Sequence, residues 1–321
     1  MRISILDAHA TDQGDTAMWD PIRALGETTI FPRTAPSELL ERCRAADAVL
    51  TNKVPLDDAA MTALPQLRYI GVTATGTNIV ALEAARAHRI AVSNVPGYST
   101  ASVAQHVIAL LLHMTNDVAA LSQRSKAGAW AASPDYCFFR KPLTELADKV
   151  LVIIGMGMIG AATGRIAESL GMRVIAAQVP GSQSPGRMAL SEALAQADAV
   201  TLHCPMTPQT TGLVDDRFLA ALKPGAILIN TGRGGLLDET AVMRALQSGR
   251  LGGLGIDVLG KEPAIAHHPL LAPDVSWADR VVVTPHVAWG TVESRRRLVA
   301  DTAANLDAFM RGVRRNRVEA P

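Results

Sequence analysis

Short runs of aliphatic and β-branched residues alternate along this chain with stretches of helical periodicity, and this alternation restricts the possible folds most strongly. Between residues 1 and 95 the expected strands lie at 3–6, 28–31, 48–51, 69–73 and 90–92, with helical stretches at 36–46 and 80–88. Strands joined by helical crossovers form parallel sheets that are covered on both faces. This part of the chain therefore predicts an α/β domain.

A second set of the same kind begins at Lys149. Its expected strands lie at 150–154, 173–177, 199–203, 226–230, 254–258 and 281–284, and its helices at 158–170, 215–221 and 238–247. Six strands with helical crossovers indicate a doubly wound parallel sheet. Because 321 residues are enough for two domains, we expect an α/β protein with two such sheets.

Three segments lie outside this alternation. Residues 101–114 are apolar around most of a helix circumference, which predicts a long helix buried on several sides and a candidate subunit interface. Residues 123–145 hold an unusual concentration of aromatic side chains, typical of an arm or packing loop. A last helix is expected from Gly290 to about Gly312, with Arg295, Arg296 and Arg297 facing solvent.

The charge balance excludes partners that need a strong electrostatic field. Lys and Arg number 31 against 30 Asp and Glu, a formal charge of +1, which is too small to attract nucleic acid or an acidic membrane. The longest apolar run, 107–112, is far too short to span a bilayer. Asp7 interrupts the apolar N-terminus, so no secretion signal is expected. These features favour a small-molecule partner.

Cysteine and histidine usage argues against disulfides and metals. The three cysteines, at 43, 137 and 204, are too few and scattered for a disulfide framework, and no CxxC pair suggests structural zinc. His267 and His268 are adjacent, and neighbouring side chains rarely point the same way, so we expect loop residues there. We therefore expect no metal and a reducing, cytoplasmic compartment.

The run Gly155-Met156-Gly157-Met158-Ile159-Gly160 directly follows an expected strand and opens an expected helix. The first glycine permits a tight turn, the second lets a pyrophosphate approach the backbone, and the third allows close packing of helix on strand. Free N–H groups at the helix start then hold the anion. The alternative is a glycine-rich turn without a ligand, but the flanking strand and helix favour dinucleotide binding.

The choice between NAD and NADP stays open. An acidic residue that binds an NAD ribose is expected at the end of the next strand, and Gln178 holds that place. A neutral amide can bond a ribose hydroxyl but does not repel a 2′-phosphate. Arg187, nine residues further along a loop, could reach such a phosphate or simply be solvated.

Polar residues follow the expected strands of the second domain, where ligands of doubly wound sheets bind. The candidates are Arg233, Glu262 and His286. A guanidinium can clamp a planar carboxylate through two hydrogen bonds. An imidazole can exchange a proton with a substrate oxygen, and a carboxylate on its other nitrogen would favour the charged ring. Each residue alone could be a structural hydrogen bonder, a turn cap or a loop charge, but together they predict hydride transfer to a 2-keto acid.

Other histidines in the second half are expected to be structural. His203 and Cys204 end an expected strand, where they would line the adenosine side of a cofactor site or pack rather than react. His106 and His113 lie seven residues apart on the long helix, where packing is the better interpretation.

The combined motifs resemble the D-isomer-specific 2-hydroxyacid dehydrogenase family over nearly the whole chain. The matching strings are Gly155–Gly160, Asn230–Gly235, Asp257-Val258, Glu262-Pro263 and Pro285-His286 with Trp289. The resemblance implies two doubly wound parallel-sheet domains. These are a flavodoxin-like substrate domain of residues 1–98 plus 290–321, and a Rossmann NAD(P)-binding domain of residues 99–289 inserted between two hinges.

The resemblance also implies site roles. Arg233, Glu262 and His286 are the catalytic residues, and the backbone of Ala74, Thr75 and Gly76, with Arg233 and His286, binds the substrate. The residues expected to bind NAD(H) or NADP(H) are Gly155, Gly157, Met158, Ile159, Gly160, Gln178, Cys204, Pro205, Thr231, Gly232, Arg233, Asp257 and His286.

Within the family, residues 52–54, 74–78, 133–138 and 286–289 look most like the glycerate dehydrogenase/hydroxypyruvate reductase branch. The implied activity is reduction of hydroxypyruvate or glyoxylate by NAD(P)H in a homodimer. Thr75 stands where phosphite-oxidising relatives carry lysine, which argues against that activity. The alternative is an NAD(H)-sensing corepressor-like binding protein on the same fold, which the three polar residues do not exclude.

Two residues depart from the family pattern. Gln178 replaces the usual acidic residue, which weakens the case for strict NAD preference. Ala81 stands where an aspartate is common, which is expected to change turn or hinge bonding.

Overall fold

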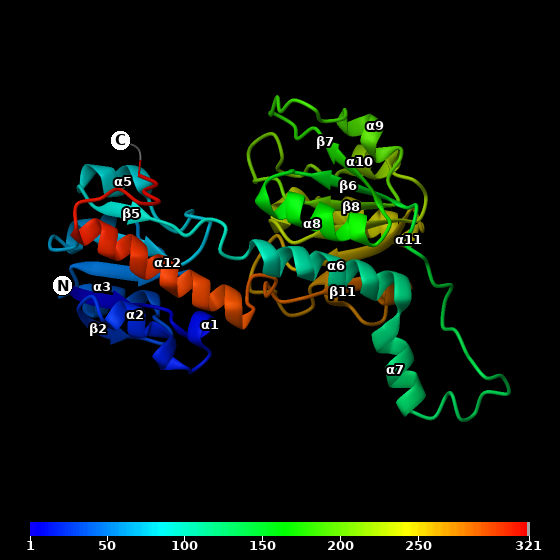
Figure 1. The fold of residues 1–321 in the computed structure, drawn as a ribbon, viewed down its shortest axis with the longest axis horizontal. Helices are drawn as coiled ribbons and strands as arrows, with labels where there is room; N and C mark the ends of the chain where they lie inside the picture. Colours follow the sequence, from blue (N-terminus) through cyan, green and yellow to red (C-terminus); the bar gives the residue numbers. More distant parts are fainter. Residues whose placement is uncertain (320–321) are drawn as a thin grey trace. The chain divides into compact units, whose positions relative to one another are not determined.

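The computed structural model describes residues 1–319, which divide into two compact units (Figure 1). Unit 1 comprises Met1–Ser99 and the chain from Gly290 onward, and unit 2 comprises Thr100–Trp289. The chain therefore passes twice between the units. Each unit contains one parallel sheet with helices on both faces, so the expected α/β class with two doubly wound sheets is confirmed.

Unit 1 is built on a five-stranded sheet with the order β2-β1-β3-β4-β5. The strands are β1 (Arg2–Ile5), β2 (Glu27–Ile30), β3 (Ala48–Thr51), β4 (Tyr69–Val72) and β5 (Ala91–Ser93). All pairings are parallel, and Ile5 lies opposite both Ile30 and Leu50. Strands β3 and β4 are buried along their whole length, as expected for a sheet covered on both faces.

Two groups of helices cover this sheet, and each forms its own apolar core. One face carries α3 (Leu39–Cys43), α4 (Asp58–Ala63) and α5 (Leu82–Ala87). The other carries η1 (Thr16–Trp19), α2 (Asp20–Arg23) and α12 (Val292–Met310), and α1 (His9–Asp12) precedes η1. The helix expected at 36–46 is split into η2 (Pro36–Glu38) and α3.

Two details of unit 1 concern residues singled out in the sequence. The expectation that Arg295 faces solvent is wrong, because this side of α12 packs on the unit 1 core. The Arg295 guanidinium is buried and donates to the carbonyl oxygens of Thr11 (2.8 Å) and Gly290 (3.1 Å). Ala81 is the N-cap of α5, and no side chain caps that helix.

Unit 2 contains a six-stranded parallel sheet with the order β11-β10-β9-β8-β6-β7. Its strands are β6 (Val150–Ile154), β7 (Arg173–Ala177), β8 (Ala199–Leu202), β9 (Ala226–Asn230), β10 (Leu251–Ile256) and β11 (Val281–Val283). The chain runs from β6 outward to β7 and then returns past β6 to β8. The strand order therefore reverses between β6 and β8, the place where doubly wound sheets bind ligands.

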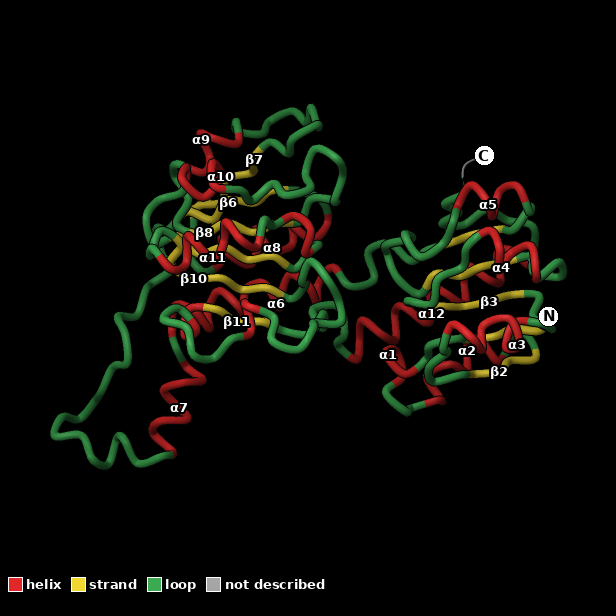
Figure 2. Tube along the Cα trace, turned by 180° about the vertical axis from the view of Figure 1, so that it is seen from behind, coloured by secondary structure: helices red, strands yellow, loops and turns green. Residues whose placement is uncertain are grey.

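The two faces of the unit 2 sheet are also covered. Helices α6 (Thr100–Asn116) and α8 (Met158–Ser169) lie on one face, and α9 (Leu190–Leu194), α10 (Asp216–Ala221) and α11 (Glu239–Gln247) lie on the other (Figure 2). Helix α6 approaches β10 closely because the strand carries glycine there. A Cβ at Gly255 would lie 3.2 Å from Cβ of Leu110, and one at Gly253 would lie 3.0 Å from Sδ of Met114.

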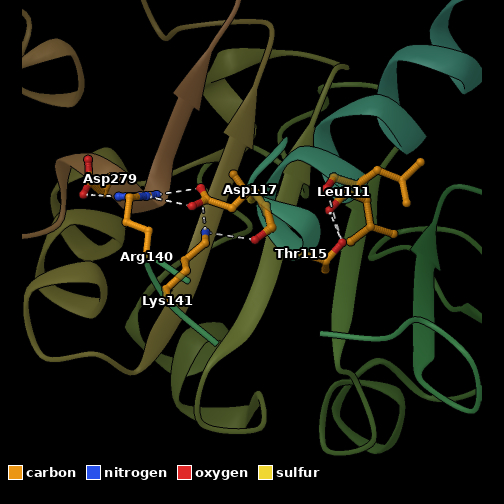
Figure 3. A network of polar contacts seen from close by, with 8 residues as sticks. Leu111, Thr115, Asp117, Arg140, Lys141 and Asp279 are labelled. Atoms are coloured by element: carbon orange, nitrogen blue, oxygen red, sulfur yellow. Dashed lines mark hydrogen bonds and ion pairs between the residues drawn. The ribbon is translucent and has the colours of Figure 1, made fainter. Parts of the chain in front are cut away.

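Helix α7 (Val118–Lys126) and the following loop form the arm expected at 123–145. The arm exposes large apolar groups: Trp130 is 57%, Tyr136 90% and Phe139 67% exposed. The C-terminal end of the arm is held by Arg140, whose guanidinium donates twice to the carboxylate of Asp117, at 2.7 Å each (Figure 3).

Candidate functional site at the carboxyl ends of the unit 2 strands

Three neighbouring strands present the predicted catalytic side chains. Arg233 follows β9, Glu262 follows β10 and His286 follows β11. Because β9, β10 and β11 are adjacent and parallel, their carboxyl ends lie at the same edge of the sheet. The glycine-rich loop follows β6 at this edge as well.

His286 and Glu262 are in direct contact. Nδ1 of His286 lies 2.6 Å from Oε2 of Glu262, whose Oε1 accepts the backbone N–H of Leu259 at 3.0 Å. The carboxylate thus fixes Nδ1 as the protonated nitrogen and leaves Nε2 for another partner. Within residues 1–319, Nε2 of His286 forms no hydrogen bond or ion pair. The backbone of His286 adopts a left-handed φ of 55°, which is uncommon outside glycine and frequent at functional sites.

Asp257 shapes the loop that carries His286. Its buried carboxylate accepts the N–H groups of Val287 (2.9 Å) and Ala288 (2.8 Å), and the hydroxyl of Thr284 (2.5 Å). The N–H of His286 donates to the Asp257 carbonyl oxygen at 2.8 Å. All these donors belong to the 284–288 loop, so Asp257 fixes the backbone from which the His286 side chain extends.

Helix α6 contributes to the same loop. Nε2 of His106 lies 2.9 Å from Oγ1 of Thr284 and 3.7 Å from Oδ1 of Asp257. His106 therefore takes part in a polar network, where the sequence indicated packing alone.

A second His–Glu pair supports the loop that carries Glu262, and the sequence reasoning missed it. Oε1 of Glu239, the first residue of α11, accepts the N–H of Gly260 at 2.9 Å. Its Oε2 lies 3.2 Å from Nε2 of His268, which is buried and whose Nδ1 accepts the N–H of Leu270. The loop is thus fastened on both sides of Glu262. The only sequence signal was an acidic residue at a helix start.

Arg233 lies in a tight turn, and its side chain is exposed. The buried Asn230 side chain spans the turn, donating to the Arg233 carbonyl oxygen (2.8 Å) and accepting the Gly232 N–H (3.0 Å). A Cβ at Gly234 would lie 2.0 Å from the carbonyl of Leu259, so only glycine fits. The exposed guanidinium of Arg233 hydrogen-bonds the Gly232 carbonyl oxygen and, in the described part of the chain, no carboxylate.

The glycine-rich loop provides a cradle for an anion. Gly155 has a φ of 100°, and a Cβ there would lie 2.4 Å from the Cys204 nitrogen. A Cβ at Gly160 would lie 2.4 Å from the Gly155 carbonyl oxygen. At Gly157, in contrast, a Cβ would meet nothing within 4 Å, and no side chain caps the start of α8. Glycine is required at 155 and 160 for steric reasons. Gly157 instead faces open space beside the uncapped N–H groups of Met158 and Ile159.

Thr231 provides a second indication of a ligand site. Its Oγ1 is buried without a hydrogen-bond partner, and such groups are costly unless a ligand satisfies them. Together with the open cradle at Gly157, this orphaned hydroxyl fits a bound dinucleotide.

Gln178 follows β7, where a ribose partner is expected. Its Nε2 donates to the carbonyl oxygen of Ser182, and its N–H donates to the Met188 carbonyl oxygen at 2.8 Å. The amide therefore also holds the 179–188 loop together. Arg187, on that loop, is half-buried and makes no hydrogen bond to any residue between 1 and 319.

His203 and Cys204 are unsuited to proton or nucleophilic chemistry. Burial lowers the pKa of His203 to about 4, and its Nε2 lies 3.1 Å from the hydroxyl of Thr201. Burial raises the pKa of the Cys204 thiol to about 11. At neutral pH the imidazole is neutral and the thiol is protonated, so neither supplies a charge. Pro205, which follows them, is exposed at the same strand end.

The residues predicted to bind the substrate carboxylate lie in unit 1, after β4. The Thr75 hydroxyl donates to the Val95 carbonyl oxygen (3.1 Å), and the Thr75 carbonyl oxygen accepts the Asn94 amide (2.7 Å). The Ala74 carbonyl oxygen accepts the Val95 N–H at 3.0 Å. The N–H groups of Thr75 and Gly76 donate to no residue described by the structure, so they remain available to an anion.

Residues 1–319 lack two other kinds of feature. No group of three or more His, Cys, Asp or Glu side chains in this range is placed to hold a metal ion. No helix in it is both long and apolar enough to cross a membrane.

Comparison with known proteins adds independent information. Residues 108–288 match the family model described as D-isomer specific 2-hydroxyacid dehydrogenase, NAD binding domain. The chain is 39% identical over 320 residues to a hydroxypyruvate reductase of Blautia hydrogenotrophica, covering 97% of this chain and 98% of that protein. It is 38% identical over 285 residues to a glycerate dehydrogenase of Methylorubrum extorquens, covering 89% of each. The crystal structure of the TT0316 protein from Thermus thermophilus matches with a TM-score of 0.85 at 32% identity, covering 99% of this chain and 100% of that one.

Proposed function

The chain belongs to the D-isomer-specific 2-hydroxyacid dehydrogenase family and is an NAD(P)-dependent oxidoreductase acting on CH–OH donors, and we propose that it reduces hydroxypyruvate and glyoxylate to D-glycerate and glycolate. The family resemblance expected from the motifs is thereby confirmed. The names of the two relatives at 38–39% identity support the substrate class. The observation that carries the chemistry is the 2.6 Å contact between His286 and Glu262, with Nε2 of His286 unpartnered among residues 1–319.

In this proposal His286 transfers the proton. When bound, the reduced nicotinamide supplies a hydride, with both its electrons, to the carbonyl carbon. Nε2 of His286 gives a proton to the carbonyl oxygen, so the keto acid gains two hydrogens and becomes the hydroxy acid. The negative charge of Glu262 stabilises the imidazolium that holds this proton before transfer. In the reverse direction the same nitrogen accepts the hydroxyl proton.

Arg233 binds the substrate in this proposal. A guanidinium presents two parallel N–H groups to a carboxylate and can also polarise the adjacent carbonyl oxygen. Its exposure and its lack of a carboxylate partner among the described residues make it available for this task. The N–H groups of Thr75 and Gly76 in unit 1, which donate to no residue among those described, are also available to a carboxylate.

The residues proposed to hold the cofactor are those of the cradle. The N–H groups at 157–159 would bind the pyrophosphate, with Gly155 and Gly160 fixing the turn. The orphaned Thr231 hydroxyl would hydrogen-bond the nicotinamide end, and Gln178 would bond the ribose. Asp257 would act mainly by positioning the 284–288 loop.

Initial rates of NADH and NADPH oxidation with hydroxypyruvate, glyoxylate, pyruvate and 2-ketogluconate test this proposal. We expect the highest kcat/KM with hydroxypyruvate or glyoxylate, and D-glycerate as the product from hydroxypyruvate. A preference for pyruvate or 2-ketogluconate would overturn the substrate assignment. Cofactor binding without turnover of any acid would instead favour the corepressor-like alternative.

We also propose a cytoplasmic homodimer. The exposed Trp130, Tyr136 and Phe139 on the arm supply apolar surface of the kind that subunits bury. The three free cysteines suit a reducing compartment. Light scattering that gives the mass of a single chain at micromolar concentration would contradict the dimer.

A further inference from the structure

The loop of Ala74, Thr75 and Gly76 is tied to one neighbouring segment of unit 1. The Ala74 carbonyl oxygen accepts the N–H of Val95 at 3.0 Å. The Thr75 carbonyl oxygen accepts the side-chain amide of Asn94 at 2.7 Å, and the Thr75 hydroxyl donates to the Val95 carbonyl oxygen at 3.1 Å. These hydrogen bonds join the loop to Asn94 and Val95, which directly follow β5.

The same bonds determine the direction of two N–H groups in the loop. The peptide bonds between Ala74 and Gly76 are trans, and in a trans peptide the carbonyl group and the following N–H point in opposite directions. Because the Ala74 and Thr75 carbonyl groups face the segment after β5, the N–H groups of Thr75 and Gly76 face away from it. Successive N–H groups on one side of a turn form a concavity that binds anions.

Asn94 is itself held on both sides of its backbone. Its N–H donates to the Asn316 carbonyl oxygen at 3.2 Å, and its carbonyl oxygen accepts the side-chain amide of Asn305 at 2.8 Å. Val95 is 1% exposed and precedes Pro96, which restricts Val95 to extended backbone. The backbone from which the Asn94 side chain extends is therefore fixed by α12 and by the segment after it.

The amide of Asn305, on α12, is used at both ends. Asn305 is 2% exposed, and its Oδ1 accepts Nη1 of Arg315 at 2.6 Å and Nδ2 of Asn316 at 3.0 Å. Since two donors face that oxygen, the amide nitrogen points the other way, to the Asn94 carbonyl oxygen. Arg315 is held in turn by the carboxylate of Asp301 at 2.7 Å. The buried amide thus connects the segment after α12 to Asn94.

This segment runs beside β5, the edge strand of the unit 1 sheet (Figure 1). Ser93 and Arg317 form an antiparallel bridge, and the N–H of Val318 donates to the Val92 carbonyl oxygen at 2.9 Å. Backbone pairing with β5 therefore brings the segment to Asn94, and its side chains are not needed to keep it there.

We propose that Asn94 and Asn305 are positioning residues for the substrate carboxylate. Asn94 holds the loop so that the N–H groups of Thr75 and Gly76 face the ligand, and Asn305 connects Asn94 to α12 and the segment after it. The inference rests on the proposed function, in which these N–H groups are available to the carboxylate of the keto acid. Both asparagines act through the loop and not on the reacting atoms.

Steady-state kinetics of Asn94→Ala tests the proposal. A contact with the carboxylate exists in both the ground state and the transition state, so its loss should raise the KM for hydroxypyruvate about tenfold and leave kcat within about threefold of wild type. The KM for NADH should not change. Asn305→Asp keeps the acceptor oxygen for Arg315 but loses the amide donor, and it should raise the same KM by a smaller factor.

A merely structural role predicts a different result. Loss of folded protein would lower the apparent kcat of Asn94→Ala at an unchanged KM, and this outcome would overturn the proposal. Gln66→Ala is the matched control, because its side-chain amide also donates to a backbone carbonyl oxygen of unit 1, that of Cys43 at 3.0 Å. It should lower the unfolding free energy without raising the KM for hydroxypyruvate. An equal rise in KM would attribute the effect to general loosening of unit 1 and contradict the proposal.

Binding of oxalate, a dicarboxylate without a keto carbon, separates this inference from the proposed function. In the ¹⁵N-labelled chain with NADH, oxalate should shift the amide resonances of Thr75 and Gly76, and Asn94→Ala should raise its Kd about tenfold. If the wild type meets both expectations but reduces no keto acid, the proposed function fails and the inference stands. If the wild type reduces hydroxypyruvate while Asn94→Ala keeps the wild-type KM and Kd, the inference fails and the proposed function stands. Resonances of Thr75 and Gly76 that do not shift at millimolar oxalate would also overturn the inference.

Discussion

Unit 2 contains two groups of polar and charged residues. In one group the chain supplies the partners, and in the other the described chain leaves polar atoms without a partner. Around Asp117 the carboxylate is 2% exposed and is held by Arg140 and Lys141, while Arg140 also pairs with Asp279 (Figure 3). At the strand ends, the guanidinium of Arg233 and Nε2 of His286 have no carboxylate partner in the described chain, and the Thr231 hydroxyl is orphaned.

The contrast separates stability from function. A buried charge that the chain satisfies itself contributes to folding, and removing its partner leaves an uncompensated charge. A polar group that the chain positions but leaves open costs stability and becomes useful when a ligand completes it. We call Asp117, Arg140, Lys141 and Asp279 the closed group, and substitutions in it should alter unfolding. Arg233, His286 and Thr231 are the open group, and substitutions in it should alter turnover.

Arg140→Gln should break the closed group. Arg140 hydrogen bonds hold the pKa of Asp117 below its usual range, so the stabilisation is present at neutral pH and is lost as pH falls through the acidic range of Asp117. We expect unit 2 to lose about 3 kcal/mol of unfolding free energy at pH 7. Urea unfolding monitors this.

The double variant Asp117→Asn/Arg140→Gln removes the unpaired charge and should recover much of the loss. Turnover per folded molecule should stay close to wild type in both variants. A large loss of kcat with unchanged unfolding would invert the comparison.

His203→Gln should change how the unfolding free energy depends on pH. Burial lowers the pKa of His203 to about 4 from 6.5, so the unfolded chain takes up a proton below pH 6.5 that the folded chain refuses until about pH 4. Wild-type stability therefore falls across this window, and His203→Gln should lose about 2 kcal/mol less between pH 7 and 4.5. His9→Gln, at an exposed site, is the control. Equal pH slopes would show that His203 titrates normally.

Gln178→Asp tests whether the residue that follows β7 sets cofactor choice. Its carboxylate would repel a 2′-phosphate, so the ratio of kcat/KM for NADH over NADPH should rise about tenfold, or ~1.4 kcal/mol. Gln178→Asn, which keeps the charge neutral, separates repulsion from loss of the bond to Ser182. The wild-type enzyme should discriminate between the cofactors by less than ~100-fold, or about 2.7 kcal/mol. A larger preference would contradict this use of Gln178.

Ala81→Asp should close an open helix start in unit 1. Ala81 is the uncapped N-cap of α5, and an aspartate there can accept the free N–H groups of the first turn. We expect unit 1 to gain about 1 kcal/mol. Ala87→Asp, at the other end of the same helix, should destabilise because the carboxylate meets the negative helix end. Equal effects of the two variants would remove capping as the cause.

The sequence predicted what depends on local pattern. Parallel strands, the turn glycines and the placement of Glu262 and His286 after strand ends all follow from periodicity and from the rule on strand ends. The structure adds that these two strands, β10 and β11, are neighbours. The 2.6 Å contact between Glu262 and His286 is a consequence of that placement.

What the sequence could not give depends on contacts between distant segments. Asp117 and Arg140 are 23 residues apart on a helix junction and an irregular loop, so neither periodicity nor a motif joins them. Glu239 and His268 meet only because α11 and the loop after β10 pack together. Arg295 was misplaced because an arginine on a helix favours solvent until the tertiary fold supplies carbonyl acceptors.

The most direct measurement is kcat for hydroxypyruvate reduction by His286→Ala and His286→Asn, with cofactor binding and unfolding measured on the same samples. The Asn variant tolerates the left-handed backbone at this position. Because Nε2 of His286 is the proposed proton donor, we expect either substitution to lower kcat by about 10²–10⁴. Cofactor binding and stability should be retained. A kcat within about tenfold of wild type, with His9→Ala as control, would show that the proton comes from elsewhere.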